Sequence, residues 1–265
     1  MKIKEITDYL ETIAPLEYQE KYDNSGLIVG DSNAEFRGAV ICLDTTEEVV
    51  EEAIGLGYNM IIAHHPIIFQ GIKKLTGKTY IGRTLLKAIK NDIAIYAAHT
   101  NLDNAFKNGV STKIAGKLGF SNLEILDPKP SFLLKGEQVG TGVIAHLDEG
   151  IPEIEFLKFI KQKLNLNCIK YTNLRNKPIK KVAICGGACS FLLKKAKEMN
   201  ADIFITADFK YHEYFNAEND IIIADIGHYE SEIFTIELIY DELKNKFSNF
   251  AAHLTNVITN PVKYL

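Results

Sequence analysis

Five of the seven histidines follow runs of apolar residues that are typical of buried β-strands. They are His64, His65, His99, His212 and His228. Several carboxylates stand at the same kind of position: Asp103, Asp208, Asp225, Glu230 and Glu232. In open α/β sheets, ligands bind beyond the carboxyl ends of the strands. Imidazoles and carboxylates gathered at that edge predict a metal site or an acid–base site.

The spacing of His228 and Glu232 is the most informative feature. Residues four apart share one face of a helix, so both side chains can reach the same site. The same spacing continues in three apolar residues, Ile236, Ile239 and Leu243. Such a stripe is typical of a buried helix face, so we expect both polar side chains to face inward. Buried polar groups must be paired or coordinated, and a plain His–Glu hydrogen bond is the alternative to a metal site.

His64 and His65 end an apolar run and precede Pro66. Adjacent side chains of an extended strand point to opposite faces, but at a strand end the chain can turn and both imidazoles can converge. Asp103 lies five residues after the next strand, and a carboxylate can bridge two cations through its two oxygens. Taken alone, the two histidines are equally compatible with partly exposed loop residues, and Asp103 is compatible with a turn former.

Together these residues form a set of three imidazoles and two carboxylates: His64, His65, Asp103, His228 and Glu232. The set is larger than one tetrahedral ion with an open position requires. It suits two divalent ions bridged by a carboxylate and a water or hydroxide. Nitrogen and oxygen ligands without sulfur fit Zn²⁺, Fe, Mn²⁺ or Ni²⁺, and spacing does not choose among them. His99, His212 and Asp208 are then candidates for supporting the ligands or transferring protons.

The elements that must position these residues alternate between short apolar strands and helices. Strands are predicted at 39–43, 60–63, 93–98, 182–185 and 220–226, and helices at 3–12, about 83–91 and 154–164. This alternation is typical of a mainly parallel sheet covered by helices. Residues 183–208 repeat the pattern of residues 40–65. In both, a strand and a turn precede a helix that ends at Gly or Asn, and a second strand then leads into a polar cluster.

We therefore expect an α/β protein made of two similar halves, with mainly parallel sheets related by a pseudo-two-fold. The N-terminal half is predicted to span residues 1–127 and the C-terminal half residues 128–265. The halves can interleave, with the chain ends packing on the opposite half.

Composition narrows the classes of function. The 265 residues are 46% hydrophobic and 24% charged, with a net charge of −4 and a pI near 6.0, which disfavours charge-driven binding to nucleic acid. No apolar run approaches the roughly 20 residues of a membrane helix, and the first residues lack the apolar region of a signal peptide. The four cysteines form no CxxC pair and are typical of reduced thiols. We expect a cytoplasmic protein that does not bind a membrane.

Five segments occur in the order that characterises a known family. They are Asp23-Asn24-Ser25-Gly26-Leu27, Ala63-His64-His65-Pro66, His99-Thr100-Asn101-Leu102-Asp103, Thr206-Ala207-Asp208 with Tyr211-His212, and Gly227-His228-Tyr229-Glu230-Ser231-Glu232. Through them the sequence resembles the NIF-three-like dinuclear metal centre proteins, often labelled GTP cyclohydrolase I type 2 homologues, from about Ile3 to Pro261. It departs from the family pattern at Tyr22, where Trp is common, and at Ala207, where Gly is common.

The resemblance implies the NIF-three-like fold, a toroidal homohexamer built as a trimer of dimers, and two metal ions per protomer at the domain interface. It carries the family's metal ligands onto the five residues already singled out: His64, His65, Asp103, His228 and Glu232. Some family members insert an extra small domain in the middle of the chain, and 265 residues leave no room for one.

Two-metal sites of this kind activate a bridging water and hold the attacked group. We therefore expect a metal-dependent hydrolase that acts through a metal-bridging hydroxide on a nucleotide-like or phosphate-ester substrate, with His99 or His212 transferring the proton. The cyclohydrolase label comes from the resemblance and does not fix the reaction. The alternative is a non-catalytic ring that binds metal as a regulatory scaffold or metal chaperone. A catalyst needs an open coordination position, and a structural site is closed.

Overall fold

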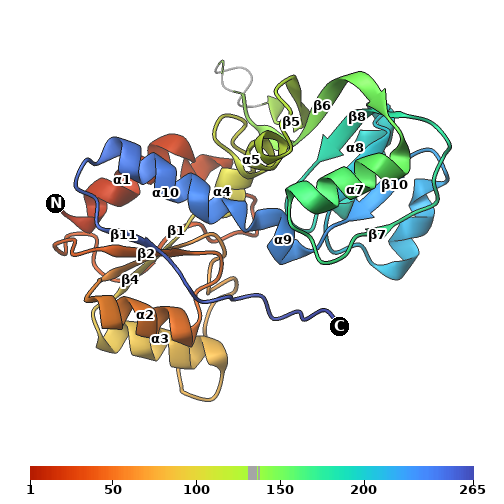
Figure 1. The fold of residues 1–265 in the computed structure, drawn as a ribbon. Helices are drawn as coiled ribbons and strands as arrows, with labels where there is room; N and C mark the ends of the chain where they lie inside the picture. Colours follow the sequence, from red (N-terminus) through yellow and green to blue (C-terminus); the bar gives the residue numbers. More distant parts are fainter. Residues whose placement is uncertain (131–135, 137) are drawn as a thin grey trace. The chain divides into compact units, whose positions relative to one another are not determined.

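The computed structural model describes residues 1–130, 136 and 138–265. They divide into two compact units, each built around its own sheet (Figure 1). The first unit comprises Met1–Leu102 and Thr235–Pro261, and the second comprises Asp103–Phe234 and Val262–Leu265.

The first unit is a sheet with helices on both faces. Its strand order is β1-β4-β3-β2-β11. Strands β2 (Ala39–Cys42), β3 (Met60–Ala63), β4 (Ala94–Ala97) and β11 (Ala252–Leu254) run parallel, and β1 (Gly26–Val29) is antiparallel to β4. Helices α1 (Ile3–Ile13) and α10 (Phe234–Lys246) cover one face, and α2 (Glu47–Leu56) and α3 (Tyr80–Lys90) cover the other (Figure 1). The unit also contains the short helix η1 (Leu16–Tyr18) and the first three residues of α4 (Thr100–Asp103), whose last residue, Asp103, belongs to the second unit.

Burial on both faces explains the composition of the central strands. Every residue of β2, β3 and β4 is buried, and all are apolar, as expected for a parallel sheet between two helical layers. Helix α2 begins where the Thr46 hydroxyl accepts a hydrogen bond from the Val49 N–H. It ends at Gly57, whose φ of 70° is a left-handed conformation that favours glycine.

The second unit has a mixed sheet with the strand order β5-β6-β8-β9-β10-β7. Strands β8 (Ile179–Ile184), β9 (Ile203–Thr206) and β10 (Ile222–Asp225) run parallel. Strands β5 (Leu123–Pro128), β6 (Gly140–Ile151) and β7 (Lys170–Tyr171) are each antiparallel to a neighbour. The helices are α5 (Val110–Lys117), α7 (Glu153–Lys163), η2 (Ser190–Leu192), α8 (Leu193–Glu198), η3 (Tyr211–Ala217) and α9 (His228–Glu232).

The predicted fold class is confirmed: the protein is α/β, with two sheets and alternating strands and helices. The first unit contains four adjacent parallel strands and the second contains three. Strand β9 lies 143 residues after β3, the offset of the sequence recurrence. The prediction of mainly parallel sheets holds for most of the first sheet. In the second sheet, antiparallel strands flank the parallel strands. The chain passes from the first compact unit to the second at 102/103 and returns to the first for residues 235–261. The predicted division into halves at 127/128 stays a prediction.

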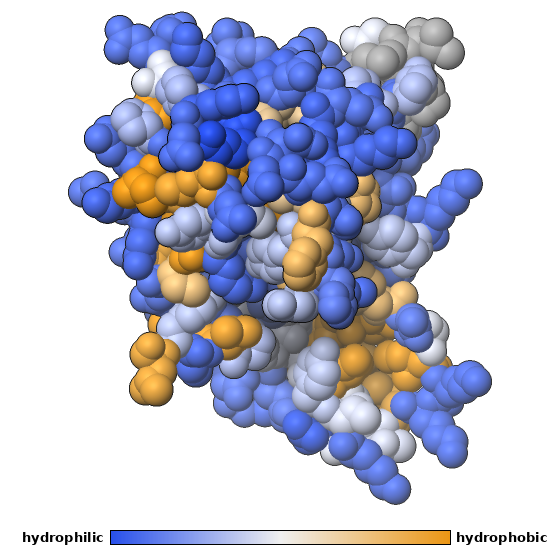
Figure 2. All heavy atoms as spheres, turned by 90° about the vertical axis from the view of Figure 1, so that its right-hand side faces the viewer, coloured by the Kyte–Doolittle hydropathy of each residue, from blue (hydrophilic) through white to orange (hydrophobic). Residues whose placement is uncertain are grey.

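The visible surface is largely hydrophilic, with hydrophobic side chains gathered in several patches (Figure 2). All four cysteines are free thiols, and three of them, Cys42, Cys185 and Cys189, are buried. Among the helices that the structure describes, none has the length and apolar character needed to cross a membrane.

Candidate metal-binding clusters

Three histidines meet at one edge of the first sheet. The last residues of β2, β3 and β4 are paired in register, so these strands end side by side. His64 and His65 follow β3 directly, and His99 follows β4 after one residue. The N–H groups of His64 and His65 still donate to the chain that leaves β2, at 3.2 and 2.9 Å. One ring nitrogen from each histidine lies within 4.8 Å of the others, as the strand-end prediction requires.

Hydrogen bonds at Nδ1 fix the tautomers of His64 and His65. Nδ1 of the fully buried His64 lies 2.7 Å from the carbonyl oxygen of Ala98. Since a carbonyl oxygen only accepts, this Nδ1 carries the proton and Nε2 keeps a lone pair. Nδ1 of His65 lies 2.8 Å from Oδ1 of Asp44. Metal-ligating histidines commonly have this arrangement, in which one ring nitrogen is held by an oxygen and the other faces the ion.

Asp44 is a residue that the sequence analysis missed. Burial raises the pKa of its carboxyl group, but hydrogen bonds from His65 and Thr259 outweigh burial and hold the pKa below its ordinary value. Asp44 is therefore a carboxylate that favours an N–H at His65 Nδ1. The sequence feature that could have identified Asp44 is its position just beyond the apolar run of β2. The histidines were identified because they follow other strands in the same way.

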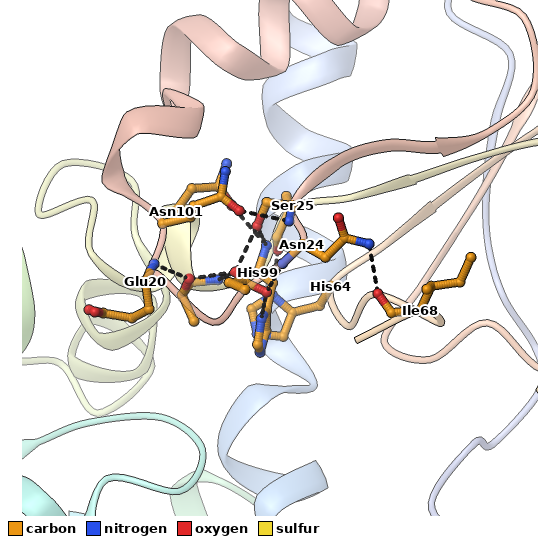
Figure 3. A network of polar contacts seen from close by, with 11 residues as sticks. Glu20, Asn24, Ser25, His64, Ile68, His99 and Asn101 are labelled. Atoms are coloured by element: carbon orange, nitrogen blue, oxygen red, sulfur yellow. Dashed lines mark hydrogen bonds and ion pairs between the residues drawn. The ribbon is translucent and has the colours of Figure 1, made fainter. Parts of the chain in front are cut away.

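His99 is anchored by a second carboxylate, that of Asp23. Its Nδ1 lies 2.7 Å from Oδ1 of Asp23, whose side chain is fully buried. Burial raises the pKa of Asp23, but hydrogen bonds from His99, Thr100 and the Asn24 N–H bring it well below its ordinary value. In Figure 3, His64 and His99 lie close together, and their ring centroids are 5.4 Å apart. The turn at Asp23 thus orients the imidazole that the sequence analysis assigned to proton transfer.

The second unit carries a cluster built from α9. His228 is its first residue, with Nε2 3.0 Å from Oε2 of Glu232 and Nδ1 2.6 Å from Oδ2 of Asp208. The i, i+4 contact is therefore present. Glu232 faces inward as predicted, with 3% of its side chain exposed, whereas His228 is 38% exposed. The sequence suggested one continuous helix, but α9 ends at Glu232 and α10 begins at Phe234.

Gly187 leaves room for the Glu232 carboxylate. It has a φ of 71°, and a Cβ at this position would lie 2.2 Å from Oε1 of Glu232. Its backbone is fixed on both sides. The N–H donates to Oγ of Ser231 at 2.9 Å, and the carbonyl accepts from the Thr206 hydroxyl at 2.9 Å. A side chain here would displace the carboxylate rather than the backbone.

Asp103 joins Glu232 within the second unit. A carboxylate oxygen of each lies within 4.8 Å of the other. Both charges act on the buried thiol of Cys189, whose pKa is raised well above its ordinary value. The causes are a hydrogen bond with Cys185, burial and these nearby carboxylates. Two carboxylates so close together strongly favour a cation between them.

The remaining strand-end residues have other surroundings. His212 lies on η3 with its ring against Tyr211 and Phe215, and it belongs to none of the ligand clusters found among the described residues. Its role in proton transfer stays a prediction. Asp225 accepts hydrogen bonds from the Phe209 N–H and the Tyr214 hydroxyl. These bonds satisfy the buried carboxylate without a metal ion.

The donor sets fit divalent metal ions. The first unit offers imidazole nitrogens whose other ring nitrogens are hydrogen-bonded, and the second offers carboxylates beside an imidazole. Nitrogen and oxygen donors without thiolate suit Zn²⁺, Fe, Mn²⁺ or Ni²⁺. The possible metal-ligand groups predicted from the sequence are thus present, while the number and identity of the ions stay predictions.

Comparison with known proteins decides the family. The model of Duf34/NIF3 (NGG1p interacting factor 3) matches residues 1–261. The chain belongs to the DUF34/NIF3 family. A Clostridium perfringens protein named GTP cyclohydrolase 1 type 2 homolog is 34% identical over 250 residues, which cover 94% of each chain.

Solved structures of DUF34/NIF3 relatives agree with the fold. A Staphylococcus aureus hypothetical protein aligns with a TM-score of 0.90 and 30% identity, covering 100% of this chain and 99% of that one. A Bacillus cereus protein related to NIF3 aligns with a TM-score of 0.90 and 27% identity over the same shares. The resemblance noted from the five sequence segments is confirmed.

Proposed function

We propose that this protein is a metal-dependent hydrolase. Its ligands for two divalent ions are His64, His65, Asp103, His228 and Glu232. The observation that carries the proposal is the histidine cluster, in which an oxygen acceptor holds Nδ1 of His64, His65 and His99. For His64 and His65, this arrangement directs Nε2 to coordination of an ion. Membership of the DUF34/NIF3 family supports it.

The chain's own residues would hold the ions and move a proton. When bound, the ions would lower the pKa of a water molecule and polarise the bond under attack. His64 and His65 would bind through Nε2, and the carboxylates would neutralise the added charge. His99 would accept or donate a proton at Nε2, because Asp23 holds its Nδ1–H and stabilises the charged imidazolium.

The substrate class rests on the relatives. Several carry the name GTP cyclohydrolase 1 type 2 homolog, so we propose a nucleotide-like or phosphate-ester substrate. Hydrolysis of either needs an activated water and a polarised bond, the chemistry that paired divalent ions supply.

Metal content is the first test. Protein purified without chelator or added metal should hold about two equivalents of a transition metal by elemental analysis. His65→Ala should hold less, and His146→Ala, which removes an exposed histidine paired with Glu124, should match the wild type. Near-zero metal in the wild type, with no uptake of added Zn²⁺, Mn²⁺ or Fe²⁺, would overturn the proposal.

Activity is the second test. Hydrolysis of GTP and of p-nitrophenyl phosphate should occur with metal-loaded protein and stop with chelator. His99→Ala should keep its metal and lose at least about a hundredfold in rate, because general acid–base groups contribute on that order. Full metal content with no hydrolysis of either substrate would instead favour the non-catalytic scaffold.

A further inference from the structure

The second unit contains an aromatic pocket of about 380 Å³, in the size range of small-molecule sites. Four aromatic side chains line it, Tyr171, Tyr211, Tyr214 and Phe215. None of its lining residues is a proposed metal ligand.

The pocket is held by fixed elements. Tyr171 lies on β7, which pairs with β10. The Ile223 N–H next along β10 donates to the Thr172 hydroxyl at 3.0 Å. The other three rings lie on η3. The hydroxyl of Tyr214 donates to the buried Asp225 at 2.9 Å, so this ring is anchored from below. The site is therefore pre-formed on one side.

Two of the rings are unusually open to solvent. Tyr211 is 74% exposed and Phe215 is 66% exposed. Their ring centroids are 5.7 Å apart with the planes at 76°, so one ring meets the other by its edge. The His212 ring stacks on Phe215 at 6.3 Å and 25°, and the high exposure of both rings shows that much of their remaining surface is open to solvent. Exposed aromatic faces that gather at a pocket indicate a binding site for a planar or apolar partner.

The polar groups of the lining indicate the chemistry of the ligand. Among the residues that the structure describes, the side-chain amides of Asn173 and Asn219 make no hydrogen bond, and both line the pocket. Each amide offers donors and an acceptor, a combination that pairs with the edge of a purine ring.

Charge in the lining argues against a phosphate. Glu218 is the charged residue there, and its carboxylate is bound by Lys197 Nζ at 2.6 Å. The lining contains no Lys, Arg or His. A nucleotide would bring a negative charge to a site with no cation among its lining residues.

We propose that the aromatic pocket binds an uncharged purine base or nucleoside, with the ring stacked on Tyr211 or Phe215 and its edge paired with the two amides. The proposal does not depend on the metal chemistry, because it rests on different residues. It assigns the second unit a ligand site of its own.

Calorimetric titration with adenosine and guanosine tests the proposal on the full chain. At least one nucleoside should bind, and its 5′-monophosphate should bind no more tightly. Phe215→Ala and Tyr211→Ala should each weaken binding about tenfold or more, as the loss of a stacking ring does. Phe191→Ala is the matched control, because Phe191 is an equally exposed ring of the same unit (65%) outside the pocket, and it should bind like the wild type.

One variant separates this proposal from the proposed function. His65→Ala removes a proposed metal ligand and should bind the nucleoside as the wild type does. Failure of both nucleosides to bind, unchanged affinity in both aromatic variants, or loss of binding in His65→Ala would each overturn the pocket assignment. Circular dichroism of each variant confirms that the comparison is between folded proteins.

Discussion

The two nitrogens of His65 have different tasks in the proposed site. Asp44 holds Nδ1 at 2.8 Å, and its other oxygen accepts from the Thr259 hydroxyl at 2.6 Å. The carboxylate is thus fixed from both sides and fixes the imidazole in turn. Such supporting groups set both the orientation and the basicity of a ligand.

Asp44→Asn tests this support. The amide oxygen can still accept from His65 Nδ1, but the negative charge that favours its proton is gone. We expect metal affinity to fall by about 10- to 100-fold, the usual effect of losing such a partner. Competition against a chelating indicator measures it. Asp8→Asn, an exposed carboxylate paired with Lys4, is the control, and equal affinity in the two variants would contradict the role of Asp44.

Gly187→Ala tests the fit of Glu232. The new Cβ would lie 2.2 Å from Oε1, so the carboxylate must move and the proposed ligand is lost. Gly119→Ala provides the control, because Gly119 also has a positive φ, 82°, but a Cβ there meets nothing within 4 Å. Both variants should lose about 1–2 kcal/mol to the left-handed backbone. Elemental analysis should show a lower metal content in Gly187→Ala than in Gly119→Ala. Equal metal content in the two variants would contradict the expectation.

The histidines of the candidate site were predictable at this scale, but the carboxylates that support them were not. His64, His65 and His99 follow apolar strands, and strand ends meet in a parallel sheet. Asp23 and Asp44 lie in turns, where carboxylates commonly bond the local backbone. The sequence does not show which turn carboxylate faces a given imidazole, because that depends on the path of the loop.

Among the elements, the junction of β8 and β9 depends on Asp202. Oδ2 accepts from the N–H groups of Lys180 and Lys181, both at 2.8 Å, and Oδ1 accepts from Arg175 at 2.8 Å. Burial raises the pKa of Asp202, but these hydrogen bonds and the Arg175 charge leave it below its ordinary value. The ionised carboxylate therefore stabilises the folded second unit.

This depressed pKa makes the contribution of Asp202 dependent on pH. The stabilisation is complete above the pKa of the unfolded chain, near 4, and is lost as pH falls through the lower folded value. Asp202→Asn should cost about 1–3 kcal/mol at pH 7 in urea unfolding, and less below pH 4. Asp148→Asn, on an exposed residue of β6, should cost little at either pH. A cost for Asp202→Asn that does not change with pH would contradict the assignment.

The core elements followed from hydrophobic runs, and the flanking ones did not. The buried strand β3 is a continuous apolar segment, and β9 is apolar up to its last residue, Thr206, so their positions were evident. Strand β6 covers twelve residues that include three glycines and two acids, and it read as short strands. Its pairing with β5 and β8 is non-local, and periodicity along the chain carries no record of such partners.

For the whole molecule, the family resemblance leads us to propose a homohexamer. Light scattering coupled to size exclusion should give a mass near six times the 29.7 kDa of the chain. A mass of one chain at every concentration tested would contradict the proposal. The oligomeric state could not be predicted from residue patterns alone, because the surfaces that form an interface exist only after folding.

Metal removal should affect the stability of the whole chain. An ion that binds only the folded chain stabilises it by mass action, by about 3–4 kcal/mol at 100 to 1,000 times its dissociation constant. For a chain of this size we expect chelation to lower the melting temperature by about 5–15 °C.

His65→Ala separates loss of metal from other effects of the chelator. The variant should melt at a lower temperature than the wild type, and chelator should change its melting temperature little, because less metal remains to be removed. Re-addition of the metal found by elemental analysis should restore the wild type and not the variant. If chelator lowered both melting temperatures equally, the stabilising ion would lie elsewhere, and the five ligands would have to be reassigned.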